Sequence, residues 1–71
     1  MAIVLYVGGS KDGDKGVVPL GFTRSRADTL DGPEIYTERF MELHGIGRVR
    51  VMALEGMGDE LVQQRAVRHY R

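Results

Sequence analysis

The alternation of apolar and hydrophilic residues over Arg48–Leu54 is the feature that most constrains the fold of this chain. A period of two is typical of a strand with one buried face, because successive side chains of a strand point to opposite sides. Val49, Val51 and Ala53 would share one side, and Arg48, Arg50 and Met52 the other. The sequence therefore predicts a half-buried strand here.

A helix is predicted directly after this strand. Gly56 and Gly58 end the alternating run, and Asp59 is a residue type that favours the helix N-cap. The apolar residues of Leu61–Tyr70 then recur at helical spacing, so we expect one amphipathic C-terminal helix.

Two shorter runs predict strands at the other end of the chain. Ile3–Val7 is β-branched and aromatic and ends at a glycine pair, which indicates a mostly buried strand. The Lys11–Asp14 stretch is a turn signal, and Gly16–Val18 is a second apolar run. Pro19 lacks an amide donor, so this second strand should be short or lie at an edge.

The middle of the chain is less regular. No period holds over Thr23–Pro33, which we interpret as a long connection. Glu34–Leu43 is predicted as a third strand, with a short helix over Glu38–His44 as the alternative, and His44–Gly47 as a tight connection.

The expected fold is thus α+β: one domain over residues 1–71, with a small antiparallel sheet of three or four strands in the order ββ-loop-ββ-α. Its single C-terminal helix would pack on one face of the sheet. The predicted core comprises Ile3, Leu5, Val7, Val18, Phe40, Val49, Val51, Leu61, Val62 and Ala66.

The glycine-rich stretch Gly8–Gly16 does not match a phosphate-binding loop. A lysine and a helix should follow the last glycine of such a loop, but Asp14 occupies the lysine position and Pro19 follows closely. Asp12 and Asp14 resemble the start of a calcium loop without its later ligands. A hairpin turn is the expected role of this stretch.

Catalytic and metal-binding patterns are not found in the sequence. There is no cysteine, and His44 and His69 are isolated from each other and from other ligand-spaced residues. Ser10 and Ser25 lie in polar segments without a nucleophile motif. We expect a protein that is not an enzyme, with no catalytic residue, no metal site and no cofactor.

Charge is distributed unevenly along a chain whose formal net charge is +0. Arg65, Arg68 and Arg71 recur every third residue at the C-terminus, where residues 61–71 contain no acidic residue. Such a row could contact phosphates, so nucleic-acid binding through these three arginines is the alternative function. Basic residues late in a helix also complement the helix dipole, which is the simpler explanation.

The leading functional prediction is a protein-binding module. One helix covers only one sheet face, and the mixed faces of the last two strands would place apolar and arginine side chains on the uncovered face. Methionine, aromatic residues and arginine are enriched in protein interfaces. The expected contact residues are Arg48, Arg50, Met52, Tyr36 and Arg68. Because a chain of this size has a small core, a protein partner or a second copy of itself would stabilise it.

The two ends of the chain resemble small uncharacterised proteins encoded by tailed phages and prophages. The resemblance rests on Tyr6–Gly13, with its Gly-Gly-x-x-Asp-Gly turn, and on Val51–Leu61 followed by a terminal Tyr-Arg pair. Ser10 stands where proline is frequent in those proteins. The resemblance implies a cytoplasmic accessory factor that binds and modulates a host protein, and it transfers no functional residue. No apolar run approaches the roughly 18 residues of a membrane span, so no membrane partner is expected.

Overall fold

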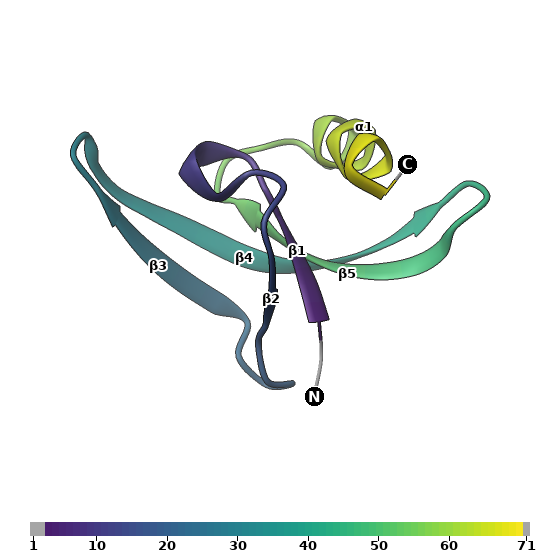
Figure 1. Ribbon diagram of the computed structural model, residues 1–71, viewed down its shortest axis with the longest axis horizontal. Coiled ribbons are helices and arrows are strands. Elements are labelled where there is room, and N and C mark those ends of the chain that lie inside the picture. The colour runs from purple at the N-terminus through teal and green to yellow at the C-terminus, as the bar shows by residue number, and fades with distance from the viewer. Residues whose placement is uncertain (1–2, 71) are drawn as a thin grey trace.

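The computed structural model describes residues 3–70 as a curled five-stranded sheet with one long helix (Figure 1). The strands are β1 (Ile3–Val7), β2 (Lys15–Val17), β3 (Arg24–Thr29), β4 (Gly32–Leu43) and β5 (Gly47–Leu54). A 3-10 turn, η1 (Gly9–Lys11), follows β1, and the helix α1 spans Asp59–Tyr70. The predicted α+β class with one C-terminal helix is confirmed.

The sheet differs from the prediction in its strand number and direction. Its order is β2-β1-β5-β4-β3, so five strands are present instead of three or four. The predicted sheet was antiparallel throughout. In the structure β1 pairs with β5 in parallel, while the other three pairs are antiparallel. β2 lies on the outer side of β1, while β4 and β3 lie beyond β5, so the polypeptide has crossed from one side of β1 to the other before β5 pairs with it in parallel.

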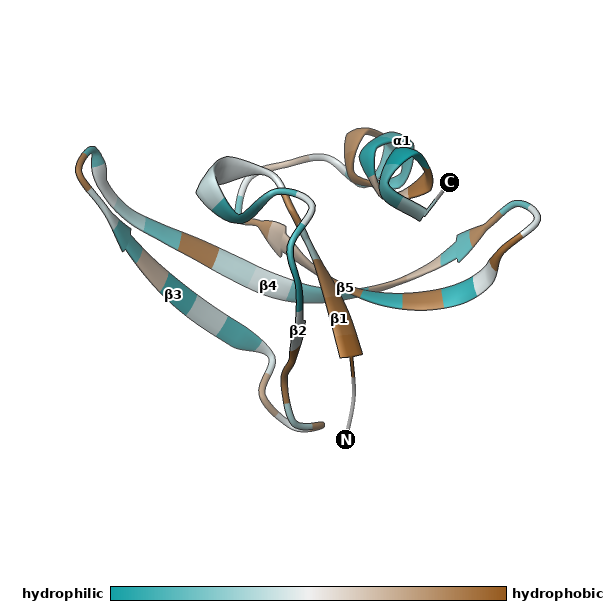
Figure 2. Ribbon diagram, viewed as in Figure 1, coloured by the Kyte–Doolittle hydropathy of each residue, from teal (hydrophilic) through white to brown (hydrophobic). Residues whose placement is uncertain are grey.

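The missing strand is β3, which lies within the stretch interpreted as a connection. Its residues are hydrophilic, and none of its side chains is fully buried. Figure 2 shows this contrast, with β3 mainly teal and white and β1 mainly brown. An edge strand is hydrogen-bonded on one side only and buries few side chains. β3 therefore forms without the alternation of apolar residues by which strands are recognised in a sequence.

The remaining elements follow the sequence closely. β4 extends as one strand to Leu43, so the alternative helix over Glu38–His44 does not form. β2 is a three-residue edge strand that ends before Pro19, as expected. The β4–β5 hairpin closes at His44–Ile46, where Gly45 and Gly47 both adopt positive φ.

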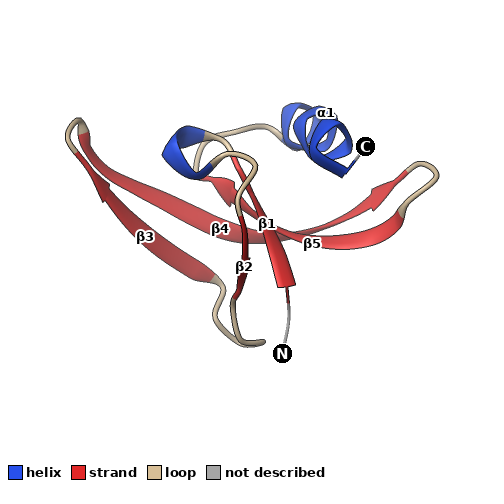
Figure 3. Cartoon of the chain, viewed as in Figure 1, coloured by secondary structure: helices blue, strands red, loops and turns tan. Residues whose placement is uncertain are grey.

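One core cluster lies between the sheet and α1, which is above the sheet in the view of Figure 3. Leu5, Val7, Val51, Val62 and Ala66 are buried as predicted, and Val49 packs against them. Met41, Leu43 and Ala53, which were not in the predicted core, complete this cluster.

Three predicted core residues are exposed. Ile3 is 68% exposed, Phe40 51% and Leu61 44%. Ile3 and Val17 are paired at the end of the β1–β2 ladder, and both are more than half exposed. Phe40 is on the sheet face away from Met41 and α1, and Leu61 is on α1 beside the buried Val62.

A second cluster occupies the opposite face of the sheet. It consists of Val4, Tyr6, Tyr36 and Met52, with Val18, Ala27 and Leu54 packed against them. The rings of Tyr6 and Tyr36 meet edge to face, with centroids 5.2 Å apart. The chain therefore has two small cores, one on each side of a single sheet.

Candidate functional site

The expected open sheet face is covered where Tyr36, Arg50 and Met52 lie, which corrects three of the predicted contact residues. Tyr36 and Met52 are completely buried, and Arg50 is only 8% exposed. The curl of the sheet brings β3 and the connection Val18–Thr23 over these side chains, so none of the three is presented to solvent. Arg48 and Arg68 are exposed, and their role as contact residues stays a prediction.

Arg50 holds the Val18–Thr23 connection against the sheet. Its Nε donates to Glu38 at 2.6 Å, a diagonal neighbour on β4. Its two terminal nitrogens donate to the backbone carbonyls of Val18, Pro19 and Phe22, the last at 3.0 Å. The planar guanidinium can satisfy several acceptors at once, which a lysine could not do in this geometry. Arg50 is therefore a structural anchor.

Exposed apolar side chains remain on the segments that contact this anchor. Leu20 and Phe22 lie in the connection that Arg50 holds and are 74% and 61% exposed. Phe40 is directly opposite Arg50 on β4, and the Arg48 guanidinium lies 5.2 Å from the centre of its ring. We call Leu20, Phe22, Phe40 and Arg48 the aromatic surface. It combines exposed apolar area with a cation held over a ring, a combination common in protein contacts.

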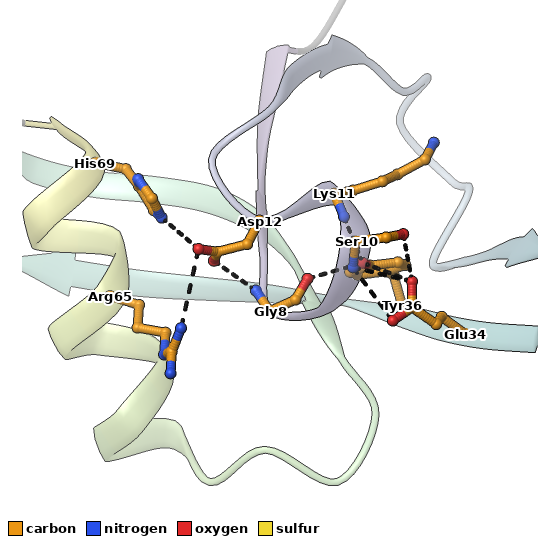
Figure 4. Close-up of polar contacts among 8 residues, drawn as sticks. All are labelled: Gly8, Ser10, Lys11, Asp12, Glu34, Tyr36, Arg65 and His69. Carbon is orange, nitrogen blue, oxygen red and sulfur yellow. Dashed lines mark hydrogen bonds and ion pairs between the residues drawn. The ribbon is translucent and has the colours of Figure 1, made fainter. Parts of the chain in front are cut away.

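The glycine-rich stretch forms a compact loop that is fastened to the sheet (Figure 4). The Tyr36 hydroxyl donates to the carbonyl of Gly8 at 2.8 Å and accepts the N–H of Lys11 at 3.2 Å. Gly9 has φ +65, and any side chain there would collide with Glu34 and Tyr36. The loop thus requires glycine for close packing, in agreement with its predicted role as a turn.

These contacts shift the pKa values of Glu34 and Tyr36. The hydroxyl of Ser10 donates to Glu34 at 2.6 Å, and this bond and that from the Ser10 N–H hold the pKa of Glu34 below its usual value. Burial raises the pKa of Tyr36, and the neighbouring carboxylate of Glu34 acts in the same direction. Both side chains form hydrogen bonds to the loop, and these bonds hold the loop against β4.

Asp12 connects the same loop to the end of α1. It accepts the Gly8 N–H at 2.7 Å, lies 3.1 Å from Nε2 of His69 and lies 3.9 Å from the Arg65 guanidinium (Figure 4). Partial burial raises the pKa of Asp12, but the Gly8 N–H, His69 and Arg65 outweigh it, so the pKa is below its ordinary value. These contacts give His69 and Asp12 a clear structural role.

The arginines predicted to bind nucleic acid do not all present an uncompensated charge to solvent. Arg65 faces Asp12, which offsets part of its charge, while Arg68 is exposed on α1. Arg71 lies outside the described residues. Nucleic-acid binding by Arg65, Arg68 and Arg71 remains a prediction without a specific observation in its favour.

A shallow hollow of about 400 Å³ lies between β4 and the first half of α1. It is lined by Arg39, Phe40, Met41, Glu42, Asp59 and Gln63. Arg39 pairs with Asp59 at 2.9 Å across it, and the Gln63 amide donates to the carbonyl of Glu42 at 3.0 Å. No local sequence pattern indicates this hollow, because its two walls are separated along the chain by the whole of β5.

No group of three or more metal-ligating side chains is found within residues 3–70. None of the helices in this range has the length and apolar character needed to cross a membrane. Comparison of the chain with protein-family models, with curated proteins and with solved structures found no match.

Proposed function

We propose that this chain is a small, non-enzymatic protein-binding module that contacts its partner through the aromatic surface. The observation that carries the proposal is the exposure of Phe22 and Phe40 beside a backbone segment that Arg50 holds in place. Large apolar side chains on a fixed surface lose little conformational entropy when a partner covers them. The resemblance to phage accessory proteins suggests a larger cytoplasmic protein as that partner.

The polar clusters support a non-enzymatic role. Asp12, Glu34 and Tyr36 have shifted pKa values, which elsewhere can indicate catalysis. Here each of these groups is occupied by contacts that fasten the Gly8–Asp12 loop. A catalytic group instead needs a free side that faces a substrate.

The test uses two matched double variants in a pull-down from cell lysate, followed by binding measurements with the purified captured protein. Arg48→Ala/Phe22→Ala removes a cation and a ring from the aromatic surface. Arg26→Ala/Leu30→Ala removes an exposed arginine and an exposed apolar side chain elsewhere. We expect affinity to fall at least tenfold for the first variant, because interface anchors each contribute about 1.4 kcal/mol or more.

The control variant should bind within twofold of the wild type. Equal binding by both variants, or a wild-type chain that stays monomeric and captures no protein, contradicts the proposal. Salt-sensitive binding of labelled RNA or DNA that is lost in Arg65→Ala/Arg68→Ala would replace it with nucleic-acid binding.

A further inference from the structure

One half of β4 has a free edge. β3 pairs with β4 only over Gly32–Thr37, and the Glu38 N–H donates to the carbonyl of Thr23 at 2.9 Å. Beyond this point no strand within residues 3–70 pairs with that edge, although β5 continues along the other side to Leu43. Figure 1 shows β3 beside one end of β4 and β5 beside the other.

The backbone groups that face this edge can be identified from the alternation of the strand. Since Glu38 points its N–H toward the β3 side, Phe40 and Glu42 point their N–H and C=O groups the same way. The carbonyl of Glu42 accepts the Gln63 amide. The Phe40 N–H and C=O have no protein partner among the described residues. In the interior of a sheet such backbone groups are hydrogen-bonded to a neighbouring strand. At an open edge they are unpaired, and another strand can add there.

The hollow described above lies beside this same edge, so an added strand would contact both β4 and α1. A residue opposite Met41 would direct its side chain toward α1 and into the hollow, while its neighbour opposite Phe40 would lie against the exposed ring. Of the two charged side chains in this segment, Arg39 is paired with Asp59, which leaves the exposed Glu42 as the charge that an added strand would face. An extended segment with two consecutive apolar residues fits these two positions.

A second copy of the chain fits less well. If β4 of another copy paired here, its residues facing the hollow would include Met41 and Leu43. Those side chains are 9% and 2% exposed because they belong to that copy's own core. They could not enter the hollow, so it would stay unfilled.

We propose that the Arg39–Leu43 edge of β4 binds an extended peptide segment as an added antiparallel strand, with one apolar side chain in the hollow beside α1. This inference rests on the proposed function and specifies how the partner would bind. Phe40 belongs both to the edge and to the aromatic surface, so a partner strand at the edge would adjoin that surface. Pairing along five residues needs a segment of about 17 Å, so the partner would contribute a flexible tail or loop.

The probe is the terminally blocked peptide Thr-Lys-Val-Phe-Thr, whose Lys, Val and Phe would lie opposite Glu42, Met41 and Phe40. NMR titration should give saturable binding below about 1 mM, which is reasonable for a contact of this size. At a free peptide concentration of about ten times the Kd, hydrogen exchange should then slow about tenfold at the amides of Phe40 and Glu42. Exchange at Arg39 and Met41 should change less, because their amides already face β5. No binding at 2 mM, or protection without this alternation, overturns the proposal.

Two variants at one position isolate the backbone bond. Phe40→Ala removes the ring and keeps the N–H, whereas Phe40→Pro removes both. We expect Phe40→Pro to bind the peptide at least fivefold more weakly than Phe40→Ala, and Arg26→Pro, at an outward-facing position of β3, to bind like the wild type. Equal binding by the two Phe40 variants overturns strand addition. If Phe40→Pro does not fold, the exchange pattern of the wild type decides alone.

The two proposals fail in different ways. A captured partner that is lost from Arg48→Ala/Phe22→Ala, together with a peptide that does not bind, leaves the protein-binding module intact and removes strand addition. A peptide that binds with the alternating protection, together with equal partner capture by both double variants, leaves strand addition and removes the aromatic surface.

Discussion

The two faces of the sheet are held in place by different kinds of interaction. On the face covered by α1, apolar side chains such as Leu5, Val51 and Val62 pack against one another. On the other face, the Arg50 guanidinium holds a six-residue connection by hydrogen bonds to its carbonyls and to Glu38. Apolar packing is distributed over many contacts, whereas the connection that covers the apolar cluster of the second face depends on one side chain. This difference predicts how each face responds to substitution.

The largest effect should come from Arg50→Met. Removing one partner of a buried ion pair leaves Glu38 without its cation and removes the donor that the carbonyls of Val18 and Phe22 share in Arg50. We expect the free energy of unfolding to fall by about 3 to 5 kcal/mol. Urea denaturation measures the loss, and Arg50→Met/Glu38→Gln should recover part of it. A loss below about 1 kcal/mol would be too small for a buried ion pair.

A smaller effect is expected for Val62→Ala on the α1 face. Val62 is fully buried, but its neighbours share its contacts, and the substitution removes two methyl groups without leaving a charge unpaired. The free energy of unfolding should fall by about 2 kcal/mol. Hydrogen exchange should quicken at all protected amides together, because α1 is part of the global core. Faster exchange confined to α1 would contradict this.

Asp12→Asn should weaken the loop in a way that depends on pH. The folded chain holds the pKa of Asp12 below its ordinary value, so the carboxylate stabilises the fold above the unfolded pKa near 4. That contribution is lost as pH falls through the lower folded pKa. At pH 7 we expect a loss of about 1 kcal/mol. The difference in the free energy of unfolding between variant and wild type should disappear in strong acid. A difference that grows in acid would show that the pKa of Asp12 is raised, not lowered, in the folded chain.

The smallest effect should come from Arg24→Ala. Arg24 pairs with Glu55 at 3.2 Å, but both side chains are more than half exposed. Exposed ion pairs contribute about 0 to 1 kcal/mol, so the midpoint of thermal unfolding should fall by no more than about 8 °C. A loss as large as that of Val62→Ala would show that β3 depends on this pair more than its exposure suggests.

The same comparison explains what the sequence could predict. The α1 face was predictable because Val49, Val51 and Ala53 alternate and Val62 and Ala66 recur at helical spacing, and both patterns are local. β3 was not, because an exposed edge strand of hydrophilic residues differs little in composition from a loop. The parallel β1–β5 pairing joins residues more than forty positions apart, and no local pattern specifies it.

The candidate site was less predictable than the fold. Arg48 and Arg50 alternate correctly onto the same face, yet one is exposed and the other is buried. The difference arises because the Val18–Thr23 connection crosses β5 at Arg50, and its path depends on the unpredicted β3. Phe40, predicted in the core, lies directly opposite Arg50 and is nevertheless 51% exposed.

The anchoring role of Arg50 is tested most directly by amide exchange in two conservative variants, Arg50→Lys and Arg48→Lys. The Phe22 N–H donates to Pro19 and the Glu38 N–H to Thr23, so both report on the connection. Lysine keeps the charge, but its three donors sit on a single nitrogen and cannot reach Glu38 and all three carbonyls from one position. Exchange at Phe22 and Glu38 should quicken at least tenfold in Arg50→Lys and stay within twofold of the wild type in Arg48→Lys. Unchanged exchange in Arg50→Lys, or equal acceleration in both variants, would contradict the assignment of Arg50 as the anchor of the second face.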